Sequence, residues 1–195
     1  MTGQHSLTGT EKAAAAKLRG MRVNRGAMAA VSNIYRAAAA VRQHVENTVL
    51  RDAELTWTGF VVLWVVWIFE EMETRYVAEE AGISKGTLTG VARTLESRGL
   101  LVRTAHPDDG RMALLALTPA GDELMNRLFP AFNAEEAFVT ARLNAAQCND
   151  LANGLRQIVA QLEEHGDQRR VDLLGGAEPT PRRGGRRKAP LGGTS

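Results

Sequence analysis

The apolar residues of this chain recur mostly at the three- and four-residue spacing of amphipathic helices. Such a pattern runs through residues 27–50 and predicts a long helix with one buried face. The pattern returns at Leu151 and Leu155. These residues belong to the apolar face of an expected last helix, which Asn144 can cap. Residues 60–69 are all apolar, but the run is far shorter than the roughly 20 residues that span a bilayer. It therefore predicts a helix buried on nearly all sides.

The segment 83–118 predicts a helix, a tight turn and a β-hairpin. Ser84 is a good N-cap, because its hydroxyl can accept a hydrogen bond from an orphan N–H of the first helical turn. Gly99 can supply the left-handed residue that ends a helix of this length. Two short apolar runs follow, residues 100–105 and 112–117, and the turn between them contains both Pro and Gly.

Two further helices are expected after this hairpin. Thr118 can cap the first of them, with Pro119 at its first position. Pro130 is expected to interrupt this helix, so that a separate one covers roughly residues 135–143. The predicted fold class is therefore mostly α with a small β-hairpin (α+β).

The exposed residues at the start of the helix that follows Ser84 are small and polar, or cationic. They leave the backbone free to approach a flat, negatively charged surface. A helix of this kind beside a hairpin is typical of DNA-binding proteins, in which the helix enters the major groove. The candidate DNA contacts are Ser84, Lys85, Thr87, Thr89 and Arg93 on the helix and Arg111 on the hairpin. The alternative for each is a polar side chain that only faces water.

At this point the sequence resembles a known family. Leu55-Thr56 opens a helix, residues 77–103 read VAEEAGISKGTLTGVARTLESRGLLVR, and PDDGR precedes Leu117-Thr118. These motifs are similar to the winged helix-turn-helix of MarR-type (multiple-antibiotic-resistance) transcriptional regulators, and the resemblance covers roughly residues 32–166. It implies a sequence-specific regulator of double-stranded DNA. Such a protein would be a repressor that binds a pseudo-palindromic operator as a homodimer and is released by a small aromatic or phenolic ligand.

The resemblance also implies how the chain is divided. The helices on either side of the DNA-binding lobe would form the dimer. The expected segments are an N-terminal arm with a short helix at 1–26, a dimerisation helix at 27–54, a winged helix-turn-helix DNA-binding domain at 55–118, C-terminal dimerisation helices at 119–166 and a disordered basic tail at 167–195.

Several positions depart from the family pattern. Gly90 stands in the recognition helix where the family often carries Arg or another polar residue, and Gly86 and Gly90 each cost roughly 0.5–1 kcal/mol relative to Ala. We expect fewer direct base contacts and more reliance on backbone contact and DNA shape. In the wing, Asp109 and Arg111 keep an ion pair that shapes the wing in the family. Gly110 replaces the Arg that often enters the minor groove.

A stripe of tryptophans lies on the helix that Thr56 can cap. Trp57, Trp64 and Trp67 share one face at helical spacing. Because the family binds its effectors beside this helix, the three tryptophans are candidate ligand contacts, together with His44 on the preceding helix. The alternative is ordinary packing of large apolar side chains in the core.

Composition narrows the remaining choices. The single cysteine, Cys148, allows no intrachain disulfide, and no secretory signal or membrane-spanning run is evident, so the expected location is the cytoplasm. A redox-sensing role for Cys148 stays open beside that of an inert packed thiol. The four histidines are scattered, and no metal cluster, phosphate loop or catalytic set stands together. We therefore expect no metal, no cofactor and no enzymatic activity.

Charge alone gives little support for DNA binding. The formal net charge is +2, yet residues 55–118 carry 6 basic and 8 acidic side chains, so the basic excess lies at the two ends of the chain. The basic side chains at 182–188 are candidate non-specific phosphate contacts. A second hypothesis therefore stays open: a helical protein–protein interaction module, or a non-specific DNA-binding protein, with a degenerate winged helix.

Overall fold

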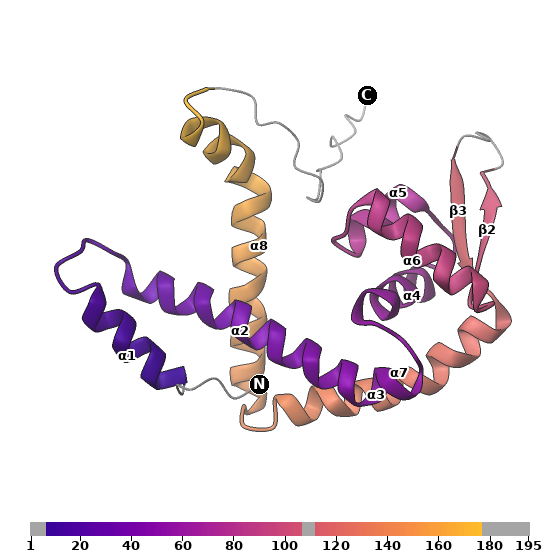
Figure 1. The fold of residues 1–195 in the computed structure, drawn as a ribbon, viewed down its shortest axis with the longest axis horizontal. Helices are drawn as coiled ribbons and strands as arrows, with labels where there is room; N and C mark the ends of the chain where they lie inside the picture. Colours follow the sequence, from indigo (N-terminus) through magenta and orange to yellow (C-terminus); the bar gives the residue numbers. More distant parts are fainter. Residues whose placement is uncertain (1–6, 107–111, 177–195) are drawn as a thin grey trace. The chain divides into compact units, whose positions relative to one another are not determined.

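The computed structural model describes residues 7–106 and 112–176 of the chain (Figure 1). Two compact units divide between His44 and Val45. The elements are α1 (Leu7–Lys17), α2 (Arg25–Asn47), α3 (Val49–Asp52), α4 (Trp57–Phe69), β1 (Met72–Glu73), α5 (Thr74–Glu80), α6 (Lys85–Ser97), β2 (Leu101–Ala105), β3 (Ala113–Leu117), α7 (Pro119–Val139) and α8 (Ala145–Leu173).

The first unit consists of α1 and most of α2. Asn33 Nδ2 on α2 donates a hydrogen bond to Glu11 Oε1 on α1 over 3.0 Å. At the start of α2, Asn24 Oδ1 accepts a hydrogen bond from Ala27 N over 3.0 Å. Hydrogen bonds from side chains therefore both join the two helices and fix where α2 begins.

The expected single helix over residues 27–50 is wrong at its C-terminal end. α2 stops at Asn47, and Thr48 leaves the helical region with φ −116° and ψ −105° before α3 begins. In an unbroken helix Val45 and Leu50 would point about 140° apart. The break allows both side chains to enter the core, where they are 1% and 0% exposed.

α4 is the centre of the second unit. Val62, Leu63, Val65 and Val66 are at most 1% exposed. The elements packed around α4 are α5, α6, α7 and β3. The expected helix is confirmed, but it is not buried on nearly all sides, because Trp64, Ile68 and Phe69 are 37%, 49% and 50% exposed. The buried faces bring the remaining elements of the lobe together.

Four helices of the second unit begin with the side-chain caps that the sequence predicts. Thr56, Ser84, Thr118 and Asn144 each accept a hydrogen bond from the backbone N–H three residues later. At α8 the capping is reciprocal, because Gln147 Oε1 also accepts from Asn144 N over 2.9 Å. These caps fix the first residues of α4, α6, α7 and α8 and so determine which faces of these helices are buried.

The wing belongs to a three-stranded antiparallel sheet in the order β1-β3-β2. β2 and β3 pair with Arg103 opposite Leu115, and the expected hairpin is thereby confirmed. β1 was not predicted, because two residues are too few to show the two-residue period of a strand. It places Met72 opposite Leu115, so the buried Leu115 lies on the central strand between two partners.

α7 runs without a break through Pro130, so the expected interruption and the separate helix at 135–143 are wrong. Proline removes one backbone hydrogen bond and crowds the preceding turn. Burial offsets that cost, since Leu128 and Phe132 on either side are only 7% and 5% exposed. The Phe132 ring also stacks on Phe60 of α4, with centroids 4.2 Å apart.

α8 extends to Leu173, so residues 167–173 are helical, although the sequence had assigned them to a disordered tail. None of the residues of α8 is buried. The predicted apolar stripe is present and open to solvent in this chain: Leu151, Leu155, Ile158, Val159 and Leu162 are 38–65% exposed.

The start of α7 touches the backbone that joins α6 to β2. Thr118 Oγ1 donates a hydrogen bond to Gly99 O, and Thr118 N donates to Leu100 O over 3.1 Å. A Cβ atom on Gly121 would lie 2.1 Å from Leu100 O. Because that obstacle is backbone, it cannot turn aside as a flexible side chain can, and only glycine fits at this position.

We expect Gly121→Ala to lower the free energy of unfolding by about 1–3 kcal/mol, the usual cost of overpacking. The measurement is the urea midpoint, followed by tryptophan fluorescence. Gly90→Ala is the matched control, because a Cβ there meets nothing within 4 Å. The control should gain roughly 0.5–1 kcal/mol from helix propensity. Equal stability of Gly121→Ala and the native protein would contradict the close approach.

Candidate nucleic-acid interface

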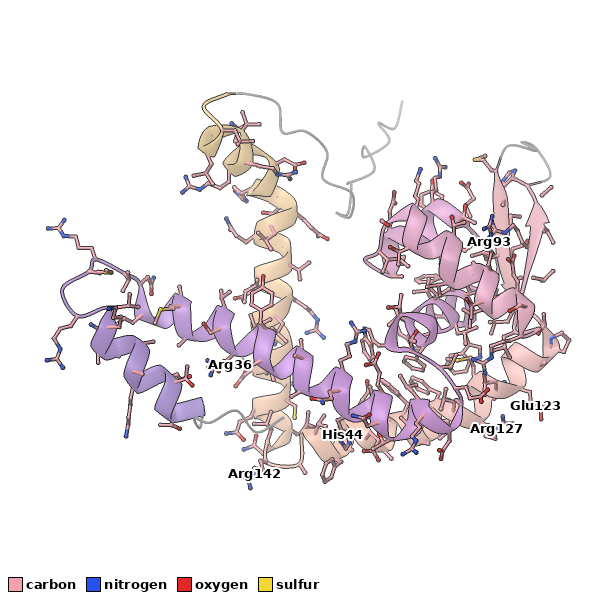
Figure 2. All side chains as sticks on the ribbon, viewed as in Figure 1. Arg36, His44, Arg93, Glu123, Arg127 and Arg142 are labelled. Atoms are coloured by element: carbon pink, nitrogen blue, oxygen red, sulfur yellow. The ribbon has the colours of Figure 1, made fainter. Side chains whose placement is uncertain are left out.

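α6 has one face in the core and one face open to solvent. Its buried residues are Leu88, Ala92 and Leu95, each at most 2% exposed. The polar residues expected to contact DNA lie outside this stripe: Lys85, Thr87, Thr89 and Arg93 are exposed and Ser84 is half-buried. Figure 2 labels Arg93 on this helix. The structure therefore brings the predicted helix residues to one capped, solvent-facing segment.

The hydroxyl groups on this segment already serve the helix itself. Ser84 Oγ accepts a hydrogen bond from Thr87 N over 3.0 Å and lies 2.8 Å from Thr87 Oγ1. Thr89 Oγ1 donates to Lys85 O over 2.9 Å. Thr89 Oγ1 can still accept from an outside donor, and one hydroxyl hydrogen of the Ser84–Thr87 pair is left to donate. Ser84 is thus first of all the residue that starts the helix.

The two cations of this face, Lys85 and Arg93, take no part in the hydrogen bonds that stabilise the helix. Among the described residues, neither Lys85 nor Arg93 has a side-chain hydrogen bond or an ion pair. Their charges can therefore meet an external anion without breaking an interaction inside the described parts of the chain.

The C-terminal end of α6 is fixed by Arg98, which the sequence analysis missed. Arg98 donates hydrogen bonds from Nη1 to Glu54 O over 2.7 Å and from Nη2 to Ala53 O over 2.8 Å. Gly99 has φ +69°, the left-handed conformation expected of it. The acceptors lie more than forty residues earlier in the chain, so no local sequence signal could have revealed this contact.

The two glycines of α6 are not required by the packing of the described residues. A Cβ on Gly90 would meet nothing within 4 Å, and one on Gly86 would meet only Ser84 Oγ at 3.8 Å. Glycine nevertheless weakens a helix interior. An alanine would fit both positions, so the reason for glycine has to be sought in what approaches the helix from outside.

A hollow of about 200 Å³ opens beside the first turns of α6. We call it the basic hollow; its lining residues are Thr74 and Arg75 of α5, Lys85, Leu88 and Thr89 of α6, and Arg103 of β2. Lys85 and Thr89 were candidate DNA contacts, whereas Arg75 and Arg103 were not singled out. Three elements supply these residues, and local spacing does not show which side chains of separate elements meet.

The tip of the wing lies outside the described residues. Arg111, a candidate DNA contact, and the expected ion pair between Asp109 and Arg111 therefore stay predictions. The described strands end beside this tip, where His106 N donates a hydrogen bond to Met112 O over 3.0 Å.

The three tryptophans of α4 have different surroundings. The Trp57 ring lies 6.2 Å from that of Phe132, and the Trp67 ring lies 5.3 Å from that of Phe129. Trp67 Nε1 also donates to Asp122 Oδ1 over 3.2 Å. These contacts with α7 favour the packing interpretation for Trp57 and Trp67.

Trp64 is the tryptophan that is most open to solvent, with 37% of its surface exposed. His44, the fourth candidate ligand contact, is half-buried on α2 and belongs to the first unit. Of the four candidates, Trp64 offers an aromatic face that the described core leaves uncovered.

Two features, a metal site and a membrane-spanning helix, are absent from residues 7–106 and 112–176. No three His, Cys, Asp or Glu side chains in these ranges are placed as a metal site would require. None of the helices described is both long enough and apolar enough to cross a membrane.

Comparison with known proteins agrees with this geometry. The family model described as "MarR family" matches residues 55–112. The chain is 31% identical to YwaE of Bacillus subtilis, an HTH-type transcriptional regulator, over 140 residues that cover 72% of this chain and 82% of that protein.

Solved structures show the same fold. BpsR of Bordetella bronchiseptica, whose DNA binding is regulated by 6-hydroxynicotinic acid, is 26% identical with a TM-score of 0.60, over 66% of this chain and 98% of BpsR. Sco3205 of Streptomyces coelicolor, a MarR family regulator solved in complex with DNA, is 23% identical with a TM-score of 0.64, over 71% of this chain and 88% of Sco3205. Since the relationship to YwaE extends over 82% of that regulator, the chain belongs to the MarR family of winged helix-turn-helix, DNA-binding transcriptional regulators.

Proposed function

We propose that this regulator is a repressor that binds a pseudo-palindromic operator as a homodimer and leaves it when a small aromatic ligand binds. The observation that carries the proposal is the exposed face of α6. There Lys85 and Arg93 stand without a side-chain partner in the described residues, next to Thr87 and Thr89. Cationic and hydroxyl groups on one helix face suit both phosphate oxygens and base edges in the major groove.

The dimer is supported by α8. A helix of 29 residues without a buried residue and with an exposed apolar stripe leaves that stripe in water unless a partner covers it. A second copy presents the same stripe, and two-fold symmetry would place two recognition helices about one DNA turn apart. In this proposal residues 55–118 bind DNA, and the segments 27–54 and 119–166 form the dimer.

Two observations support the proposal of an aromatic ligand: the exposure of Trp64 and the ligand that regulates BpsR. Trp64 is 37% exposed on α4, and α4 packs directly against α6. BpsR responds to 6-hydroxynicotinic acid, an aromatic acid. A ligand on this face of α4 can change operator affinity if it binds the DNA-bound and free forms with different affinity.

The test of DNA recognition is a fluorescence-anisotropy titration with a duplex from upstream of the protein's own gene, beside a shuffled duplex, at about 0.15 M salt. We expect binding to the native duplex to be at least about 100-fold tighter. Lys85→Ala with Arg93→Ala should abolish this preference, because both free cations of the α6 face are lost.

The matched control, Lys12→Ala with Arg19→Ala, removes two exposed charges of the N-terminal arm, outside the DNA-binding and dimer segments. This control should keep the preference for the native duplex. If the Lys85 and Arg93 variant kept it too, the assignment of α6 would be wrong. Equal, weak binding of both duplexes by the native protein, followed by no enriched site in an unbiased selection, would favour a non-specific binder or a protein–protein module.

Gly90 tests whether DNA approaches the helix backbone. Gly90→Ala should raise the free energy of unfolding by roughly 0.5–1 kcal/mol. It should also weaken operator binding by about tenfold, because the added methyl group holds DNA away from the backbone. Gly26→Ala in the N-terminal arm, where a Cβ would lie in ordinary contact 3.6 Å from Asn24 Oδ1, should leave operator affinity unchanged. Unchanged operator affinity of Gly90→Ala would show that DNA does not approach closely there.

The ligand is tested in the same assay with 6-hydroxynicotinic acid as the probe. We expect it to lower operator affinity of the native protein by about tenfold, a typical allosteric coupling. Trp64→Ala should remove the response while leaving operator affinity without ligand unchanged, because Trp64 lies outside the α6 face. A non-aromatic carboxylate of similar size is the control. A full response in Trp64→Ala would place the ligand elsewhere.

A further inference from the structure

The basic hollow gathers three cations that are far apart in sequence. Arg75, Lys85 and Arg103 reach it from α5, α6 and β2, and none of the described residues that line it carries a carboxylate. Glu73 and Glu96 pair with two of these three cations, so three positive and two negative charges leave the hollow a net charge of +1, which an anion can neutralise. One wall of the hollow is the face of α6 assigned to DNA.

Both arginines are held in place before any ligand arrives. The Arg75 guanidinium lies 4.4 Å from the centroid of the Tyr76 ring and donates from Nη2 to Tyr76 Oη over 2.8 Å. Its Nε lies 2.7 Å from Glu73 Oε2. Arg103 donates from Nε to Glu96 Oε1 over 3.0 Å. Side chains positioned in this way lose less conformational entropy when they bind.

These contacts leave donors unused. A guanidinium has five N–H groups, and Glu96 takes one of those on Arg103. No other acceptor for Arg103 is found among the described residues. The Glu73 and Glu96 side chains are only 16% and 26% exposed, and they are not part of the lining. The arginines therefore present further N–H groups and Thr74 adds a hydroxyl, whereas the hydroxyl hydrogen of Thr89 is already donated to Lys85 O.

We infer that the basic hollow receives one phosphate of the DNA backbone, so that Arg75 and Arg103 contact DNA beside the groove-reading residues of α6. The forked donors of arginine match the oxygens of a phosphodiester. Such contacts fix the register of a protein on the duplex and carry no sequence information. The inference rests on the proposed function, because Lys85 and Thr89 belong to both sites.

The experiment compares Arg75→Gln with the native protein in titrations of the native and shuffled duplexes at several salt concentrations. We expect the slope of log K against log salt concentration to become shallower by about 0.9 for each bound protomer. Affinity should fall by roughly tenfold and by the same factor for both duplexes. Arg75→Lys keeps the charge and should keep the slope. Removal of either arginine would leave a glutamate, Glu73 or Glu96, without its partner, so the thermal unfolding of Arg75→Gln is compared with that of the native protein.

Arg19→Gln is the matched control, since it removes one charge from an exposed side chain of the N-terminal arm, outside the DNA-binding and dimer segments. It should leave the slope unchanged, and thermal unfolding should show that both variants fold. Suppose that Arg75→Gln still prefers the native duplex and shows an unchanged slope of log K against log salt concentration. This result would overturn the inference and leave the proposed function standing. A shallower slope on both duplexes without any preference would support the inference and overturn the specific repressor.

Two further outcomes count against the inference. If the native protein binds neither duplex, both proposals fail. A calorimetric titration with inorganic phosphate shows whether the hollow serves a free anion instead. Phosphate binding that Arg75→Gln abolishes, together with an unchanged DNA slope, would assign the hollow to a free anion and overturn its role in DNA binding.

Discussion

The second unit depends on the burial of α4. This helix is apolar on almost every side, and each fully buried valine or leucine contributes roughly 1.5–3 kcal/mol relative to an exposed one. No single neighbour can cover such a helix, so α5, α6, α7 and β3 each take one side of it. The recognition helix is therefore placed by its apolar face, through Leu88, Ala92 and Leu95, and its polar face is left free to vary with the DNA that it binds.

Features that depend on neighbouring residues could be predicted from the sequence. Ser84 and Asn144 were recognised as caps because a cap and its N–H partner lie three residues apart. The break expected at Pro130 is wrong for a related reason. The cost of a proline in a helix can be read from the local sequence, but the packing of Phe132 on Phe60 that offsets this cost joins residues far apart in the chain. The pairing of Arg98 with the α3–α4 connection and the meeting of Arg75 with Arg103 depend on the folded arrangement, which residue spacing does not contain.

The DNA-facing side of this protein is only weakly basic. Arg75 and Arg103 are each paired with a glutamate, and two hydroxyls of α6 serve the helix itself. Non-specific attraction to phosphate scales with the number of charges neutralised, so a surface of this kind gains little affinity for arbitrary DNA. Discrimination between sites then depends on a few well-placed groups and on how closely the duplex can approach Gly86 and Gly90.

The close approach of Gly121 to Leu100 O also has a mechanical consequence. With Thr118 bonded to Gly99 and Leu100 as well, α7 has no free hinge at its root. Its 21 residues form a rod roughly 30 Å long. A tilt of about 5° at this root moves the far end by roughly 3 Å, and the reverse holds equally. The first turn of α7 therefore moves together with the backbone that leads into β2, and a displacement of one displaces the other.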